Sequence, residues 1–353
     1  MDFDLTEDRR MLSDTLTRYL AEQYGFEHRN SVAYTAPYHD AEKWTEMADL
    51  GILAAFAPED AGGFGGTGFD VSVVFEALGR ALCPEPMLAA LMASRLMMAT
   101  GADQETLLDG SRKYAVAIGE IECPYGLDYL ATSASAHGDG HVLSGRKTAV
   151  YGGQTADVFL VAAMLNGSLA LFEVAANDAE IVGYGMMDGG GAAEVLLDGT
   201  RAKLLLADAR DALQDALNAG VLALCAESLG AMVYSYEMLL EYLKTRKQFG
   251  VNIGRFQVLQ HRAVDMLTEI EQARSIVIKA AAELNGPKAT RYCAMAKNLI
   301  GRAGRLISEE SIQMHGGIAM TWEYPASHYG KRLVMIDHQL GDTDFHLAAV
   351  MAG

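Results

Sequence analysis

The stretch TRKQFGVNIGRFQVLQHRAVDM, Thr245 to Met266, joins two long helical patterns. Apolar residues recur every three or four positions before it, across residues 222–243, and again after it, across residues 259–284. That spacing is the period of a helix with one buried stripe. Two such helices joined by a short link usually pack antiparallel. The sequence therefore predicts a helical bundle organised around this link.

The link contains charged, amide and aromatic side chains that a helical hairpin does not need. It contains an arginine, Arg246, followed by Gln248 and Phe249, and a second phenylalanine at Phe256. A plain hairpin requires a glycine and little else. The added cation, amide and rings indicate a surface that meets something anionic and planar.

Composition and charge exclude several classes of function. Half of the 353 residues are hydrophobic, which is ample for a large core or several domains. The formal net charge of −18 argues against nucleic acid as a partner, because phosphate binding needs a basic footprint. It does not exclude a nucleotide cofactor. No cluster of cysteines has metal-ligand spacing, and the four cysteines are interpreted as free thiols of a reducing compartment.

The sequence shows neither the apolar run of a membrane span nor the pattern of a signal peptide. No apolar run reaches the roughly 18 residues that a membrane span requires. The acidic start MDFDLTEDRRMLSDTL lacks the apolar core of a signal peptide. We therefore expect a cytoplasmic protein with no membrane span.

The pattern changes twice along the chain, which predicts three domains: helical at 1–112, β-rich at 113–205 and helical at 206–353. In the middle region, short β-rich runs are bounded by Gly, Asn and Asp. Asn166-Gly167 between two apolar runs is a strong hairpin signal. Several such runs favour a small antiparallel sheet or barrel. The loop at 61–69 is rich in glycine, which permits close approach of a ligand or simply forms a flexible surface loop.

Three phrases in register resemble those of the acyl-CoA dehydrogenase family of flavoenzymes. They are FAPEDAGGFGGTGFD at 56–70, YLKTRKQFGVNIGRFQVLQHRAVDM at 242–266 and IQMHGGIAMTWEYPASHYGKR at 312–332. The resemblance implies N-terminal helices, a middle β domain and a C-terminal four-helix bundle. It also implies bound FAD and α,β-dehydrogenation of a CoA thioester. In that reaction a carboxylate takes the α-proton and the flavin takes the β-hydrogen as hydride.

The carboxylate that the family uses as base is missing from its usual places. Counted from Glu323-Tyr324-Pro325, the family's glutamate falls on Leu340, and the alternative place used by some members falls on Gly220. Asp342 is our first choice of substitute, although Gly-Asp-Thr is also good helix-capping chemistry. Glu227 lies two turns from the alternative place and is also interpreted as an ordinary helix charge.

The flavin residues divide into two sets by the same resemblance. Within the chain's own β domain, Tyr151 takes the place of the hydroxyl residue that faces the flavin. The second set belongs to the half-site that grips the FAD of an adjacent subunit, with Arg246 on the pyrophosphate and the glycines admitting backbone amides. Its members here are Arg246, Gln248, Phe249, Gln257, Gln313, Gly316 and Gly317. Phe256, the second ring of the link, is a further candidate for cofactor binding.

Three functional hypotheses follow from the resemblance. The first is an FAD-dependent acyl-CoA dehydrogenase of lipid or steroid degradation. It would act on an acyl-CoA, pass electrons to an electron-transfer flavoprotein or similar acceptor, and form a homo- or heterotetramer. The second is a non-catalytic subunit that completes the FAD site of a partner, as in the shorter subunits of steroid side-chain dehydrogenases. The third is another reaction on the same fold, such as an oxidase.

Overall fold

The computed structural model describes residues 5–352 as two compact units. One, the helical unit, comprises residues 5–26, 71–83 and 221–352. The other, the barrel unit, comprises residues 27–70 and 84–220. The three-domain division therefore stays a prediction.

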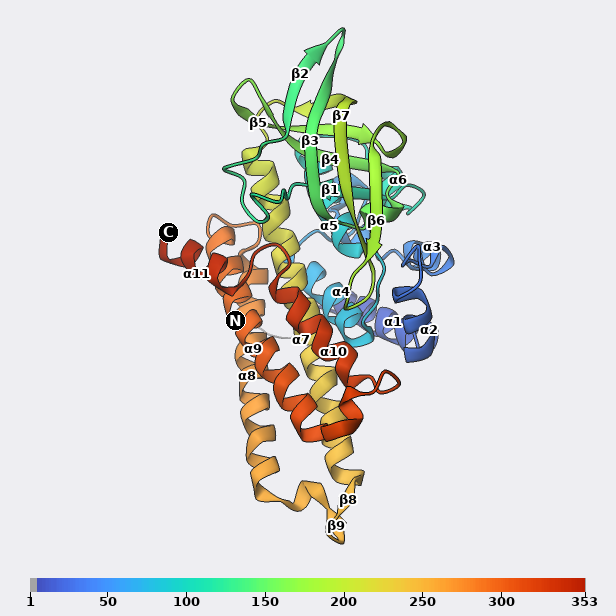
Figure 1. Cartoon of the computed structure of the whole chain (residues 1–353), viewed down its shortest axis with the longest axis vertical. Coiled ribbons are helices and arrows are strands. Elements are labelled where there is room, and N and C mark those ends of the chain that lie inside the picture. The colour runs from blue at the N-terminus through green and yellow to red at the C-terminus, as the bar shows by residue number, and fades with distance from the viewer. Residues whose placement is uncertain (1–4, 353) are drawn as a thin grey trace. The chain divides into compact units, whose positions relative to one another are not determined.

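Long helices make up the helical unit, and Figure 1 shows α8, α9 and α10 running beside one another. The apolar stripe predicted over 222–243 is buried except at Tyr236, which is half-buried. At Gly230 of α7, an added Cβ would collide with the Glu76 carbonyl of α4, so the two helices require glycine there. The helices that contribute to this unit are α1 (Glu7–Gln23), α4 (Gly68–Ala81), α7 (Arg210–Thr245), α8 (Gln257–Glu283), α9 (Ala289–His315), α10 (Ala326–Asp337) and α11 (Thr343–Ala352).

The barrel unit contains a seven-stranded sheet that closes on itself. Strands β4, β2, β3, β7 and β5 pair in a ring, with β1 beside β4 and β6 beside β7. The sheet closes as a barrel, one of the two expected forms, but it is not wholly antiparallel, because β4 pairs in parallel with both β1 and β2. The strands are β1 (Tyr114–Ala117), β2 (Ser133–His137), β3 (Gly140–Tyr151), β4 (Val158–Leu165), β5 (Ser168–Ala175), β6 (Glu180–Gly185) and β7 (Gly191–Leu206).

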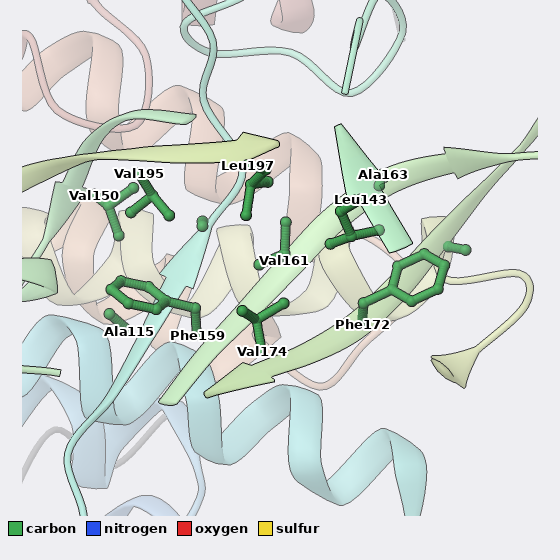
Figure 2. Close-up of a cluster of buried hydrophobic side chains, with 12 residues drawn as sticks. Ala115, Leu143, Val150, Phe159, Val161, Ala163, Phe172, Val174, Val195 and Leu197 are labelled. Carbon is green, nitrogen blue, oxygen red and sulfur yellow. The ribbon is translucent and has the colours of Figure 1, made fainter. Parts of the chain in front are cut away.

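The predicted hairpin is present between β4 and β5, where Asn166 and Gly167 both have positive φ. Alternate side chains of the strands fill the barrel. Figure 2 shows Phe159 and Val161 of β4 gathered with Val174 of β5 and Val195 of β7, all buried. Burial of such side chains is the main source of the sheet's stability.

Shorter helices complete the barrel unit: α2 (Phe26–Ala33), α3 (Ala41–Asp49), η1 (Ala54–Phe56), η2 (Glu59–Ala61), α5 (Met87–Thr100) and α6 (Glu105–Leu108). The glycine-rich loop that follows η2 is neither loose nor free to hold a ligand with its amides. The amides of Phe64, Gly65 and Gly66 donate to the carbonyls of Ala54, Ala57 and Ala55. The glycines are thus needed for close packing of backbone on backbone.

By length and hydropathy alone, one helix within residues 5–352 could cross a membrane, namely α7. Its most apolar 18-residue window has a mean hydropathy of 1.6, and 89% of that window is buried inside the structure. This helix carries charges such as Glu227, so the expectation that no uninterrupted apolar run reaches about 18 residues is not contradicted. The expected fold class, mainly α with a middle β domain, is confirmed.

Candidate functional site

A two-stranded hairpin projects from the link between α7 and α8. Its strands are β8 (Lys247–Gln248) and β9 (Val251–Asn252), and its turn is Phe249-Gly250, both with positive φ. Such a turn matches the twist of a tight hairpin. It leaves the Phe249 side chain 90% exposed and in edge contact with Phe256, with ring centroids 6.2 Å apart. Arg246, Gln248 and Gln257 are exposed around it, so the hairpin presents a cation, amides and rings outward.

The end of α9 lies beside the base of this hairpin. His315 packs against Tyr242 of α7, with ring centroids 4.8 Å apart, and the Arg246 amide donates to the Tyr242 carbonyl. The turn η6 (Gly316–Met320) follows directly. The structure therefore brings the predicted Gly316 and Gly317 close to the hairpin, while Gln313 is exposed on the last turn of α9.

The two glycines offer open backbone. Gly316 has φ +68° and ψ −148°, a region that essentially only glycine occupies. A Cβ placed on either Gly316 or Gly317 would meet no atom within 4 Å, so their backbone borders open space. Burial lowers the pKa of the neighbouring His315, which favours the neutral imidazole. Its Nδ1 contacts the Ser311 carbonyl at 2.8 Å, and its buried Nε2 has no hydrogen-bond partner within residues 5–352.

This half of the site fits part of an FAD. An exposed guanidinium suits a pyrophosphate, exposed rings suit a planar heterocycle, and uncovered glycine backbone permits close approach. The eight predicted flavin residues outside the β domain lie between the end of α7 and the first residue of α8, or at the end of α9 and the start of η6. Their role as flavin ligands stays a prediction.

The loop that should carry the base lies between α10 and α11. Leu340 occupies the expected position, with φ +53°, and its carbonyl contacts His346 Nε2 at 3.0 Å. Asp342 is half-buried, and one of its carboxylate oxygens accepts the Phe345 amide at 2.8 Å. That contact caps the start of α11, as the capping interpretation anticipated. Gly220, the alternative position, is buried within α7 and has no side chain to titrate.

The Glu227 carboxylate is already paired with an arginine of the same chain. Its two carboxylate oxygens accept from Nε and Nη2 of Arg332 at 2.6 and 2.7 Å, and both side chains are largely buried. The third Arg332 nitrogen, Nη1, donates to the Gln339 side-chain oxygen at 3.0 Å. Both oxygens of the Glu227 carboxylate are therefore held in a bidentate ion pair within the fold.

The base loop and the hairpin lie at different ends of the helical unit. Figure 1 shows β8 and β9 at one end of α8 and α11 near the other. Asn298 of α9 donates to the Thr343 carbonyl, whereas His315, 17 residues further along α9, contacts Tyr242. At 1.5 Å per residue the two places are about 25 Å apart. The structure therefore does not bring Asp342 together with the hairpin residues of the same chain.

Tyr151 lies in the barrel unit, at the end of β3, paired with Ala192 of β7. The nearby loop that follows β1 is held by a buried ion pair, Lys147 Nζ to Glu120 Oε1 at 2.7 Å. Glu120 also accepts the amides of Ala131 and Thr132 at 2.6 and 3.0 Å. Burial opposes ionisation of Glu120, but Lys147 and these amides outweigh it and lower its pKa. This loop is therefore fixed by its own contacts.

The match to known families agrees with this geometry. The description "Acyl-CoA dehydrogenase, N-terminal domain" matches residues 6–105, and "Acyl-CoA dehydrogenase, C-terminal domain" matches residues 210–352. Together the two matches cover more than half of the chain. The chain belongs to the acyl-CoA dehydrogenase family. The expected class of oxidoreductase is thereby confirmed.

Relatives within the acyl-CoA dehydrogenase family match over nearly the full length. Acyl-CoA dehydrogenase IpdE2 of Mycobacterium tuberculosis is 27% identical, with 92% of this chain and 91% of that protein covered. Among solved structures, the ChsE4–ChsE5 complex of M. tuberculosis is 25% identical with TM-score 0.91, covering 100% and 98% of the two chains. A variant of the Tcur3481–Tcur3483 steroid acyl-CoA dehydrogenase is 27% identical with TM-score 0.91, covering 98% and 97%. Both structures contain two differently named chains.

Sequence reasoning missed the buried cations of this fold. Lys297, whose side chain donates to carbonyls of the base loop, and the Arg332–Glu227 pair stand out only in three dimensions. One signal was available for Lys297. It is a single lysine within the alternating apolar pattern CAMAKNLIG, where a solvated charge would break the buried stripe.

Proposed function

We propose that this chain is a subunit of a heteromeric, FAD-dependent acyl-CoA dehydrogenase. The assembly removes two hydrogens across the α,β bond of an acyl-CoA thioester. In it, this chain completes the FAD site of a related partner chain, and the partner supplies the catalytic carboxylate. Bulky acyl groups, such as those of steroid side chains, are the proposed substrate class.

One observation carries this proposal: counting along the sequence puts Leu340 at the place of the family's base, while the residues predicted for the donated half-site are present. The Arg246 hairpin and the Gly316-Gly317 turn form one exposed surface, about 25 Å from the loop of Leu340. A surface that is exposed in the single chain is suited to a ligand held by another chain. The likeness to two-chain assemblies adds support.

The proposed contributions of this chain are binding and orientation. Arg246 would hold the pyrophosphate by charge-assisted hydrogen bonds, and Phe249 would cover a planar ring. Gly316 and Gly317 would let the backbone approach the dinucleotide. FAD, when bound, supplies the hydride acceptor for the reaction. The partner's carboxylate would take the α-proton in a site from which water is excluded.

The test is purification of the chain alone and together with the product of a neighbouring gene for a related dehydrogenase. The proposal predicts little bound flavin in the chain alone and stable flavin in the mixed assembly, with turnover of acyl-CoA only there. Light scattering measures the assembly, and visible absorbance against protein concentration measures the flavin-to-chain ratio. One FAD per chain and full turnover in the chain alone would refute it.

A homo-oligomeric dehydrogenase with Asp342 as base is the second candidate. Asp342 is half-buried, and within residues 5–352 only one of its carboxylate oxygens accepts a hydrogen bond. The other oxygen would serve as proton acceptor. Asp342→Asn distinguishes the two, because it should abolish turnover in a homo-oligomer and leave turnover of the mixed assembly unchanged.

In either case we propose an electron-transfer flavoprotein or a similar acceptor as the oxidant of the reduced flavin. We also propose a cytoplasmic location. The cysteines support it: none of the four forms a disulfide within residues 5–352, and Cys123, Cys225 and Cys293 are buried.

A further inference from the structure

A buried lysine lies under the loop that carries Leu340. Lys297, on the inner face of α9, is 0% exposed. Its ammonium donates to the carbonyl of Asp337 at 3.0 Å and to that of Gly341 at 2.5 Å. These two carbonyls bracket Leu340 on the chain. One side chain therefore ties both ends of the loop to the same point on α9.

Further hydrogen bonds fasten the same segment. Asn298, the next residue of α9, donates to the Thr343 carbonyl at 2.9 Å, and the Thr343 hydroxyl donates to Asp337 at 2.8 Å. His346 contacts the Leu340 carbonyl through Nε2 at 3.0 Å. Burial, together with the nearby charge of Lys297, lowers the His346 pKa to about 4, so the ring is neutral and can donate only one N–H. No room exists for a side chain at Gly301, where a Cβ would collide with Asp337 and Thr343.

The surroundings compensate the lysine charge only in part. Burial lowers the Lys297 pKa to about 8, against the attraction of Cys225, Asp337 and Asp342. Arg332 on α10 opposes the charge. Two carbonyl dipoles are then the direct ligands of an ammonium that has no bulk water around it. Hydrogen bonds to a buried charge of this kind are stronger than neutral ones.

We propose that Lys297 is the positioning residue of the segment 337–343. It holds the backbone in the one conformation that keeps Leu340 at the place of the family's base and Asp342 on the first turn of α11. The loop is therefore a fixed structural part of this chain and not a mobile catalytic loop. What the fixed loop implies for proton transfer rests on the proposed function. The role of Lys297 in holding the loop does not.

The experiment compares Lys297→Met with Lys279→Met in the assembly as purified. Methionine keeps most of the length of the side chain and removes its donors. Lys279 is a lysine of α8 whose side chain is partly exposed and pairs with Glu283. Hydrogen exchange should accelerate about tenfold or more over residues 338–346 in Lys297→Met, and stay unchanged over 259–284. The control variant should change neither segment.

The stability of the wild type and Lys297→Met, measured as a function of pH, separates an effect of the buried ammonium from a loss of side-chain packing alone. The folded lysine releases its proton near pH 8 and the unfolded one near pH 10.5. Between these values the unfolded chain binds more protons, so the wild type gains stability relative to Lys297→Met as pH rises. Unfolding midpoints from pH 7 to 10.5 measure this difference.

Equal exchange over 338–346 in the wild type and Lys297→Met, or parallel pH profiles, would overturn the proposal. If Lys297→Met does not fold, Asn298→Ala replaces it. That variant removes one donor to the same segment and should accelerate exchange there by a smaller factor, and unchanged exchange would count against the proposal. These measurements report on the loop alone, so they can fail while the flavin ratio still supports the proposed function.

Discussion

Gly317 gives a sharp test of the flavin half-site because its substitution separates binding from folding. An added Cβ would meet no protein atom within 4 Å, and its φ lies outside the left-handed region. Gly25 in the loop before α2 shares both properties. Gly317→Ala and Gly25→Ala are therefore a matched pair, equal in their effect on the free chain and different only if a ligand approaches Gly317.

The structure gives the expected magnitudes. A surface substitution without a steric clash changes the free energy of unfolding by about 0.5 kcal/mol or less. A methyl group inserted into a close-packed contact costs about 1–3 kcal/mol. If flavin packs on Gly317, its dissociation constant should rise about 5- to 150-fold, since 1.4 kcal/mol corresponds to roughly a factor of ten.

The assay is flavin release from the purified assembly, followed by fluorescence during dilution, with thermal unfolding measured in parallel. Gly317→Ala should lose flavin, whereas the flavin-free forms of Gly317→Ala and Gly25→Ala should unfold at the same temperature. Gly316→Ala is not a substitute, because its backbone conformation strains any side chain. Wild-type flavin affinity in Gly317→Ala would show that the backbone there does not contact the cofactor.

Three further predictions concern single side chains. Arg246→Ala should lower flavin occupancy with unchanged helix content by circular dichroism, and Arg246→Lys should restore it only in part, since a lysine lacks the planar fork; full occupancy in the alanine variant would make this arginine structural. In denaturant unfolding, Asp342→Ala should destabilise the chain by about 1 kcal/mol through loss of the helix cap, and Asp342→Asn by less. Equal stability of the wild type and both variants would show that Asp342 does not stabilise α11. Burial lowers the Lys147 pKa to about 8, so the wild type should gain stability relative to Lys147→Met from pH 8 to 10.5, and a flat difference would contradict this.

Much of the fold follows from periodicity in the sequence. The stripes over 222–243 and 259–284 correspond to α7 and α8, and Asn166-Gly167 forms the expected hairpin. Strands β2 and β6 were not recognised. Both are mostly exposed and lack the apolar alternation on which prediction depends. The parallel pairs of β4 involve partners distant in sequence, which local patterns do not specify.

The candidate site was predictable in part for a different reason. Residues of the hairpin are close in sequence, so a local motif was enough to group Arg246 with Phe249. The state of the candidate carboxylates was not predictable, because it depends on distant partners. Glu227 meets Arg332 across 105 positions of the chain. The glycine-rich loop was misjudged because its contacts with η1 are made by backbone atoms, which no residue type announces.

The most direct test of the central claim is anaerobic reduction of the flavin by acyl-CoA, followed through the visible absorbance. It is measured for this chain reconstituted with FAD alone, and for its assembly with the related partner chain. We expect rapid bleaching in the assembly, unaffected by Asp342→Asn in this chain, and none in the chain alone. Bleaching in the chain alone that disappears with Asp342→Asn would contradict the account and identify this chain as a dehydrogenase in its own right.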